Sequence, residues 1–541
     1  MDKVKRFREE VIRQYGTGAR VWFLIMDSGY LSIKDIKTLQ TCYRWFNTYL
    51  IPQIKLKVHQ IEHYQRMNDI YKNVHGMHDS SPTGSGKTYT AMKYSVDTGR
   101  RMLYICEMNV EEHVRRLTQV YRVPVVDIVR YHTLRGVATS TLKHPYLVRN
   151  GSDFEPTPYY LQLVQLGISL VFDEVQNLKN DSIQFHAAMA LVKPIYDRNR
   201  PNPSTVLLMS WTAADKVDCL DNILKLLGII PDCKLIEYNR STKMYDHIGL
   251  YEAYRQAYAF DPHIANASYL SMTKTKAEAL NCLRNLHINV FKKFIVSGTP
   301  KPINDKIKVT VCNKFYKVRQ ERYERIREAV EELSRAVHYD EDTGQTFFTE
   351  NSKGLLWSIM PVIEYEKAEI FACESYYILN TYPTSKIFVV LYSLNAIAYV
   401  EHILQNCNPT VLTGSVNPIL RDKYIQEFQQ PNLNRRLIIA NGQIMSRGVS
   451  LDDFHGGFPR TAFLSPTFNF INLTQAVDRI NRANTQSDVT VNVVYVEGLE
   501  QEERILASLA DKSDFAKDML FNSENAIFPG DFERVTSGSH L

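Results

Sequence analysis

The chain has 541 residues, of which 44% are hydrophobic and 23% are charged, and its formal net charge at pH 7 is +5. One hydrophobic core rarely organises a chain of this length, so we expect two or more globular domains and exclude a disordered or fibrous protein. The small basic excess is compatible with a nucleic-acid partner but does not by itself indicate one.

Eight scattered cysteines form no CxxC pair, which argues against a zinc site and a disulfide framework and is typical of a reducing compartment. The charged start of the chain, MDKVKRFREEVIRQYG, is unlike a secretory signal, and no apolar run is long enough to span a bilayer. We therefore expect a soluble, intracellular protein with no membrane partner.

Residues 1–52 are charged and aromatic and predict a helical N-terminal extension. The stretch SSPTGSGKTYT, residues 80–90, then fits a phosphate-binding loop, although Ser81 stands where the general pattern has its first glycine. Two glycines would let backbone N–H groups turn toward phosphate oxygens, and the following helix would add its positive end. The alternative is an ordinary Gly/Ser turn before a helix. The candidate phosphate-binding residues are Thr83, Gly84, Ser85, Gly86, Lys87 and Thr88.

The apolar run of residues 168–172 is followed by two acids, Asp173 and Glu174. This pattern predicts a buried parallel strand whose carboxyl end lies beside the phosphate loop. Lys87 would then bind the β- and γ-phosphates, while Thr88 and Asp173 would hold Mg²⁺. Glu174 would polarise the attacking water. The two motifs together predict a site for ATP and Mg²⁺, whereas an isolated acidic pair would usually be only the start of a loop.

These motifs resemble those of superfamily 2 helicases and translocases, and the second half of the chain continues the series. The segment QAVDRINR carries Gln475, Arg479 and Arg482 at intervals of four and three, which predicts one helix face that presents all three. The resemblance implies that this face meets the γ-phosphate across an interdomain cleft, where the planar arginine fork can bind two oxygens. A solvated helix face is the alternative. In character, the motifs are closest to Swi/Snf-type ATPases and the transcription-linked helicases of large DNA viruses.

The resemblance also implies roles for residues in the first half of the chain. Tyr64 and Gln65 lie where the family reads adenine, with His59 and Gln60 as a competing register. Nucleic acid would contact the segment IVRYHTLRG, and LLMSWTAAD would couple the nucleotide to domain motion. The segment SGTP, residues 297–300, imitates the coupling motif, but we set it aside because it lies far downstream without a suitable strand before it. The residues implied are Tyr131 and His132 for nucleic acid and Ser210, Trp211 and Thr212 for coupling.

In the second half, the resemblance implies that Thr413 and Gly414 touch a nucleic-acid phosphate. The segment RLIIANGQIMSRGVSLDD carries a further motif with Ser446. Within it, Arg447 is implied for nucleic acid, and Gly448 and Asp452 for the nucleotide.

The implied fold is α/β, with two tandem RecA-like domains whose parallel sheets are flanked by helices. We expect the first at residues 53–236 and the second at 385–498. A helical insertion or linker would occupy residues 237–384 between them, and a helical tail would occupy 499–541.

The implied function is a nucleic-acid-dependent ATPase that couples hydrolysis to translocation on, or unwinding of, DNA or RNA. DNA is favoured over RNA, and viral transcription is the implied process, with transcription or replication machinery as partners and a virion or viral factory as one location besides cytoplasm and nucleus. The alternatives are a nucleotide-dependent nucleic-acid-binding scaffold and a motor subunit of a larger complex without strand separation. Oligomeric state is not indicated.

Overall fold

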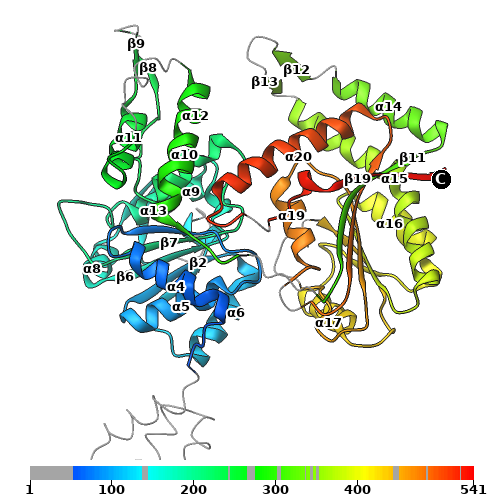
Figure 1. Ribbon diagram of the computed structural model, residues 1–541, viewed down its shortest axis with the longest axis horizontal. Helices are drawn as coiled ribbons and strands as arrows, with labels where there is room; N and C mark the ends of the chain where they lie inside the picture. The colour runs from blue at the N-terminus through cyan, green and yellow to red at the C-terminus, as the bar shows by residue number, and fades with distance from the viewer. Residues whose placement is uncertain are drawn as a thin grey trace, which may run out of the picture.

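Two lobes lie side by side in the computed structural model, each built on a parallel sheet covered by helices (Figure 1). The described residues are 53–136, 144–239, 241, 244–264, 275–300, 306–334, 337–340, 345–348, 352–442, 450–482, 485–523 and 526–540. The predicted extension at residues 1–52 lies outside them. No helix in these ranges combines the length and the hydropathy that a membrane span requires.

Six parallel strands make up the sheet of the first lobe, in the order β10-β1-β7-β6-β2-β3. The strands are β1 (Gly76–Asp79), β2 (Arg101–Cys106), β3 (Val125–Arg130), β6 (Ile168–Asp173), β7 (Thr205–Met209) and β10 (Val296–Ser297). Strands covered on both faces read as continuous apolar runs, as in ISLVF of β6 and TVLLM of β7. The prediction of a first RecA-like sheet is confirmed.

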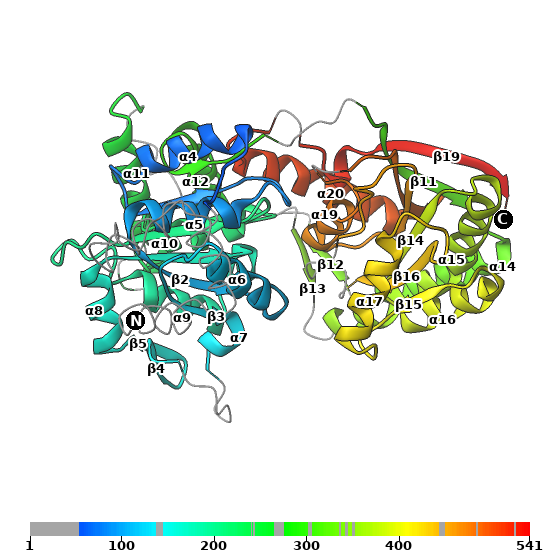
Figure 2. The same ribbon diagram turned by 90° about the horizontal axis from the view of Figure 1, so that it is seen from below.

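Helices cover both faces of this sheet because alternate strand residues point to opposite sides. Met102 and Tyr104 of β2 pack with one helix layer, and Leu103 and Ile105 pack with the other. Figure 2 shows α4 and α5 on one side of the sheet and α8 and α9 on the other. The first layer is α4 (Val58–Ile70), α5 (Lys87–Thr98) and α6 (Met108–Val120); the second is α8 (Pro158–Leu166), α9 (Ile183–Val192) and α10 (Leu220–Leu226).

Seven parallel strands form the sheet of the second lobe, in the order β15-β16-β14-β17-β18-β11-β19. They are β11 (Val309–Lys317), β14 (Lys386–Leu391), β15 (Thr410–Leu412), β16 (Leu437–Asn441), β17 (Arg460–Leu464), β18 (Val489–Val496) and β19 (Glu533–His540). The helices α15 (Ser352–Thr381) and α16 (Leu394–Ile403) cover one face, and α17 (Pro418–Gln429), α19 (Phe470–Asp478) and α20 (Glu500–Met519) cover the other. The second RecA-like sheet is thereby confirmed.

The segment 237–384 contributes strands to both sheets, which the expectation of a helical linker did not include. Its strand β10 pairs with β1 in the first sheet, and β11 pairs with β18 in the second. Because β10 belongs to its sheet, the first lobe extends further along the chain than residue 236. The two residues of β10 are too few to give a recognisable strand pattern in the sequence. The second lobe correspondingly begins before residue 385, with β11.

The remaining elements include short connections and several helices. They are α7 (Tyr131–Leu134), β4 (Leu147–Asn150), β5 (Asp153–Pro156), η2 (Val175–Leu178), η3 (Val217–Cys219), β8 (Glu237–Asn239), β9 (Met244–Asp246), α11 (Ile248–Phe260), α12 (Lys276–Leu286), η5 (His287–Phe291), α13 (Lys292–Ile295), α14 (Gln320–Ser334), β12 (Val337–Asp340), β13 (Gln345–Phe348), η6 (Gln405–Cys407) and η7 (Pro529–Asp531). Of these, α11, α12 and α13 add buried side chains to the core of the first lobe.

The predicted C-terminal tail is helical only in part, and it joins the lobes. Helix α20 begins against the second lobe and ends against the first, and β19 then adds an edge strand to the second sheet (Figure 1). Leu509 of α20 belongs to the apolar core of the second lobe, whereas Phe515 and Met519 belong to that of the first.

Candidate nucleotide-binding site

The predicted phosphate loop follows β1 directly and leads into α5. Gly84 and Gly86 have φ angles of 79° and 92°, in the left-handed region that a residue with a Cβ adopts only at a cost. Helix α5 begins at Lys87, so its unpaired N–H groups open onto the loop. Lys87 Nζ donates to the carbonyl oxygens of Ser81, at 2.8 Å, and Pro82, at 3.2 Å. The lysine therefore lies along the inside of the loop.

The glutamine that reaches this loop is Gln60, the competing register, and not Gln65. Gln60 Nε2 donates to the carbonyl oxygens of Ser85, at 2.7 Å, and Gly86, at 3.4 Å. Gln65 is exposed, and the hydroxyl of Tyr64 donates to Asp97 at the far end of α5. The structure therefore favours the competing register of His59 and Gln60 over Tyr64 and Gln65, because the phase of α4 turns position 60 toward the loop.

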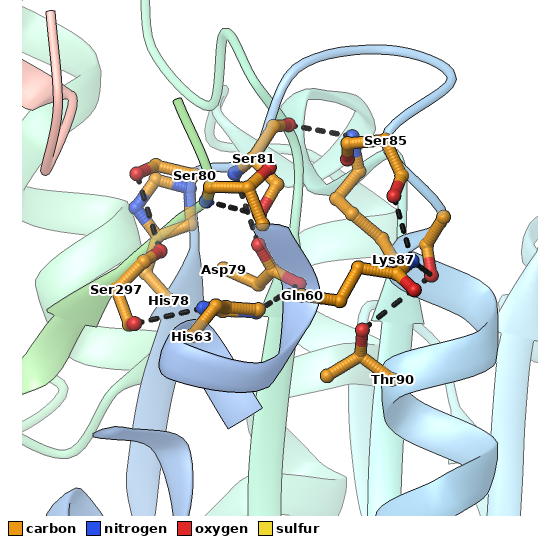
Figure 3. Close-up of polar contacts among 12 residues, drawn as sticks. Gln60, His63, His78, Asp79, Ser80, Ser81, Ser85, Lys87, Thr90 and Ser297 are labelled. Atoms are coloured by element: carbon orange, nitrogen blue, oxygen red, sulfur yellow. Dashed lines mark hydrogen bonds and ion pairs between the residues drawn. The ribbon is translucent and has the colours of Figure 1, made fainter. Parts of the chain in front are cut away.

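A buried ion pair supports the loop from behind (Figure 3). His63 Nε2 lies 3.0 Å from Asp79 Oδ2, at the end of β1, and His63 Nδ1 lies 2.8 Å from Ser297 Oγ, at the end of β10. Burial opposes ionisation of Asp79, but the charge and hydrogen bond of His63, with help from Lys87, lower its pKa to about 2. One histidine thus ties α4, β1 and β10 together directly beneath the loop.

The segment SGTP, which we had set aside, is part of this support. Strand β10 precedes it, and Ser80 N–H donates to Ser297 O at 2.8 Å, while Thr299 N–H donates to Ser81 Oγ at 3.0 Å. A Cβ atom on Gly298 would lie 2.8 Å from Ser80 Oγ, so the two segments are in close contact. The expectation that no suitable strand precedes SGTP is therefore wrong, because β10 pairs with β1 immediately before it.

The two predicted acids end β6 beside the phosphate loop. Burial and the neighbouring Glu174 carboxylate raise the pKa of Asp173 to about 7. The Tyr104 hydroxyl donates to Asp173 Oδ2 at 2.8 Å and is also hydrogen-bonded to the Thr88 side chain, so the two predicted Mg²⁺ ligands flank one tyrosine. Glu174 has φ 54° and ψ 55°, a left-handed conformation that is uncommon outside glycine and clusters at functional sites.

The predicted coupling residues form a hydrogen-bonded chain with the acids. Gln176 Nε2 donates to Glu174 Oε2 at 2.7 Å, and Ser210 Oγ donates to Gln176 Oε1 at 2.6 Å. The backbone N–H of Thr212 donates to Ser210 Oγ at 3.1 Å. Trp211 leaves the first lobe altogether and packs in the apolar core of the second.

The arginines of the second lobe face this site. A Cβ atom placed on Gly84 would lie 3.9 Å from Cγ and Cδ of Arg482. Burial and the nearby Arg482 lower the pKa of Arg479 to about 10, while the Glu174 carboxylate opposes that shift. The phosphate loop, the acidic pair and both arginines are therefore brought together at the junction of the lobes, and Gln475 is buried on α19.

One feature of the arginine prediction is wrong, because helix α19 ends at Asp478 and Arg482 lies beyond it. The Arg479 carbonyl accepts from Leu451 N–H at 2.8 Å, and the Arg482 backbone N–H donates to Thr485 Oγ1 at 2.9 Å. These contacts replace the next helical turn. Arg482 therefore approaches Gly84 from a turn and not from a helix face.

Of the other predicted nucleotide-site residues of the second lobe, one is buried near Arg482 and others lie outside the described residues. Asp452 is buried; burial lowers the pKa of Arg482, and the Asp452 carboxylate opposes that shift. Ser446, Arg447 and Gly448 fall in residues 443–449, which the structure does not describe.

Of the predicted nucleic-acid contacts, Tyr131 is wrong. It is buried, and its hydroxyl donates to the backbone carbonyl of Asp173 at 2.7 Å, so it serves the nucleotide side of the lobe. His132 and Gly414 are exposed, and Thr413 is half-buried with its hydroxyl 2.8 Å from that of Ser415.

These residues fit a triphosphate with Mg²⁺. The loop has left-handed glycines, an inward lysine and a helix N-terminus, which together form an anion cradle. The raised pKa of Asp173 marks a buried carboxylate that a cation would stabilise. Among the residues the structure describes, no cluster of three or more His, Cys, Asp or Glu side chains forms a metal site of the protein's own.

Comparison with known proteins agrees with the motif series. No family model matches the chain. A protein of Acanthamoeba polyphaga mimivirus, named "Putative ATP-dependent RNA helicase", is 25% identical over 475 residues, which cover 85% of this chain and 82% of the relative. The predicted resemblance to superfamily 2 helicases is confirmed. A solved structure, the Sulfolobus solfataricus SWI2/SNF2 ATPase core in complex with dsDNA, covers 86% of this chain and 97% of its own at 15% identity, but its TM-score of 0.30 is too low to support an argument.

Some residues of the site left little or no trace in the sequence. No motif marks His63 in EHYQ or Asp79 in GMHD, because their pairing depends on a helix and a strand that meet only in the folded protein. The sequence offered Gln60 as the alternative to Gln65. The helical period places residues 60, 63, 67 and 70 on one buried face, and this pattern could have favoured Gln60.

Proposed function

We propose that this chain is a superfamily 2 ATPase that binds ATP and Mg²⁺ between its lobes and uses hydrolysis to move along nucleic acid. The observation that carries the proposal is that two arginines of the second lobe lie against the site in the first: Arg482 lies beside Gly84 of the phosphate loop, and Arg479 interacts with Glu174. The similarity to a mimivirus protein named as a helicase supports the same class of activity.

The first lobe would hold the nucleotide. Backbone N–H groups around Gly84 and Gly86 would bind phosphate oxygens, and Lys87 would exchange its present carbonyl acceptors for the β- and γ-phosphates. Thr88 and Asp173 would hold Mg²⁺, which would neutralise charge on the phosphoryl oxygens. Glu174, oriented by Gln176, would polarise the attacking water.

The second lobe would complete the site. Arg479 and Arg482 are charged and largely buried, and a triphosphate would supply the anion that two neighbouring guanidinium groups require. Asp452 and Gln475 would hold this part of the second lobe in place. Because binding would then favour the closed arrangement of the lobes, hydrolysis and release would reopen it.

The coupling residues Ser210, Trp211 and Thr212 would report the state of the nucleotide to the second lobe. The chain of hydrogen bonds from Glu174 through Gln176 to Ser210 and Thr212 would shift when the γ-phosphate leaves. Trp211 lies in the core of the second lobe, so that shift would move the lobes relative to each other.

Nucleic acid would bind across both lobes, with His132, Thr413, Gly414 and Arg447 as contacts. Contacts to phosphates would give weak sequence preference and marked salt dependence. The resemblance of the motifs to Swi/Snf-type ATPases and to helicases of large DNA viruses favours duplex DNA and a role in viral transcription with its machinery. The name of the mimivirus relative, by contrast, specifies an RNA helicase. We propose DNA as the first polymer to test.

The experiment measures ATP hydrolysis by the purified full chain with duplex DNA, single-stranded DNA or RNA. We expect stimulation by at least one polymer and loss of turnover in Lys87→Ala and Glu174→Gln. Triplex displacement and strand-separation assays would then distinguish translocation from unwinding. Hydrolysis by Glu174→Gln at the wild-type rate would refute the assignment, and nucleotide binding without any hydrolysis would favour the scaffold alternative.

A further inference from the structure

The start of the phosphate loop is in contact with the C-terminal part of the chain. Ser80 is buried, and its hydroxyl accepts a hydrogen bond from the backbone N–H of Phe521 at 3.0 Å. The same hydroxyl donates to the carbonyl oxygen of Ser297 at 3.2 Å. Two segments far from the loop in sequence therefore meet at its first residue.

Phe521 reaches this position because α20 crosses from the second lobe to the first. At its start, Glu502 is paired with Lys367 inside the second lobe. At its end, Asp518 is paired with Arg284 of the first lobe. Just beyond the helix, the centroid of the Phe521 ring lies 4.0 Å from the guanidinium carbon of Arg66 on α4.

The chain then returns to the second lobe. The Phe528 ring is fully buried, with its centroid 4.8 Å from that of Trp211 and 5.4 Å from that of Phe470, the first residue of α19. Strand β19 completes the return by pairing with β11. The segment that touches Ser80 is thus anchored in the second lobe on both sides.

We propose that Ser80 and Phe521 are positioning residues, through which the second lobe holds the start of the phosphate loop in the shape that binds nucleotide. The inference rests on the proposed function in assigning this loop to ATP. It adds a path between the lobes besides the arginines and Trp211. The start of this loop thus has three partners from distant segments: Ser297 and Phe521 bond to the Ser80 hydroxyl, and the Thr299 N–H bonds to the hydroxyl of Ser81, which stands at the place of the usual first glycine.

A backbone donor can be removed by proline, and position 521 suits that substitution. Leu520 has φ −80° and ψ 140°, the extended conformation that a residue before proline prefers. Phe521→Pro removes both the N–H and the ring, whereas the matched control Phe521→Ala removes the ring alone. Ser80→Ala removes the acceptor and tests the same bond from the other side, independently of proline.

The measurement is the equilibrium affinity for Mg²⁺·ADP, with KM and kcat for ATP, in the full chain. We expect Phe521→Pro to weaken the affinity about fivefold relative to Phe521→Ala and wild type, the effect of one lost hydrogen bond. Ser80→Ala should weaken it at least as much, because it also loses the bond to the Ser297 carbonyl. KM should rise in parallel, with kcat changed less than about twofold. The double variant Ser80→Ala/Phe521→Pro should bind no more weakly than Ser80→Ala alone, because Ser80→Ala already removes the bond from the Phe521 N–H.

Multiplying effects in the double variant, or affinities within about twofold of wild type in both single variants, would overturn the proposal. Thermal midpoints without nucleotide identify a variant that fails to fold, and Ser80→Ala then decides alone. Nucleic-acid-stimulated hydrolysis by wild type tests the proposed function separately. If the variants bind nucleotide as wild type does while wild type hydrolyses ATP, only this inference is refuted. If the variants lose affinity as expected but wild type does not hydrolyse ATP, only the proposed motor function is refuted.

Discussion

At the scale of single residues, Gln60 and Gln65 lie on the same helix but have different surroundings. The Gln60 side chain contacts the phosphate loop, whereas that of Gln65 is exposed to solvent. Gln60→Ala should weaken ADP binding about fivefold or more, because two hydrogen bonds to the phosphate loop are lost. Gln65→Ala is the matched control and should bind ADP as wild type does, since the side chain is exposed. Equal affinities for the two variants in a fluorescence titration would count against the corrected register.

Because of Asp173, we expect the stability of the folded protein to depend on pH, and this dependence can be measured without nucleotide. The pKa of Asp173 is raised to about 7, so the folded, metal-free protein holds a proton that the unfolded chain releases above about pH 4. Stability therefore falls as pH rises through this interval. Metal-free Asp173→Asn should have a higher thermal midpoint than wild type near about pH 8, and the two should converge near about pH 5. A wild type that is the more stable of the two at the higher pH would contradict the shift.

At the scale of elements, Trp211 bridges the lobes through the aromatic contact with Phe528. Trp211→Ala should destabilise the protein by about 3 kcal/mol or more, because it leaves a cavity in the core of the second lobe. Trp211→Phe should recover part of that loss. Urea unfolding of Trp211→Ala, Phe528→Ala and the double variant measures the coupling, and strictly additive losses would show that the contact carries no energy of its own.

Sequence reasoning succeeded for elements whose chemistry is local. The glycines and lysine of the phosphate loop and the acids after β6 are fixed by spacing within one strand–loop–helix unit. It failed where partners come from distant segments. Strand β10 is only two residues long, and its place beside β1 follows from pairing across more than two hundred residues. Arg482 leaves its predicted helix because Thr485 and Leu451 take up the backbone groups of the next turn.

At the scale of the whole molecule, two RecA-like lobes follow from the alternation of buried strands and helices, so their existence could be predicted. The manner of their connection could not. Helix α20 reads in the sequence as a charged tail, yet its apolar side chains are divided between the cores of both lobes. The two lobes are therefore joined by covalent chain, by Trp211 and by buried arginines near the acidic pair.

The hydrolysis rate of Arg479→Ala tests the shared site most directly, since Arg479 belongs to the second lobe and Glu174 to the first. We predict a loss of about a thousandfold in kcat, with ADP affinity within about threefold of wild type, because the arginine would act on charge that develops during phosphoryl transfer. Arg479→Lys should remain impaired, since an ammonium lacks the planar fork. Turnover by Arg479→Ala at the wild-type rate would contradict a nucleotide held between the lobes.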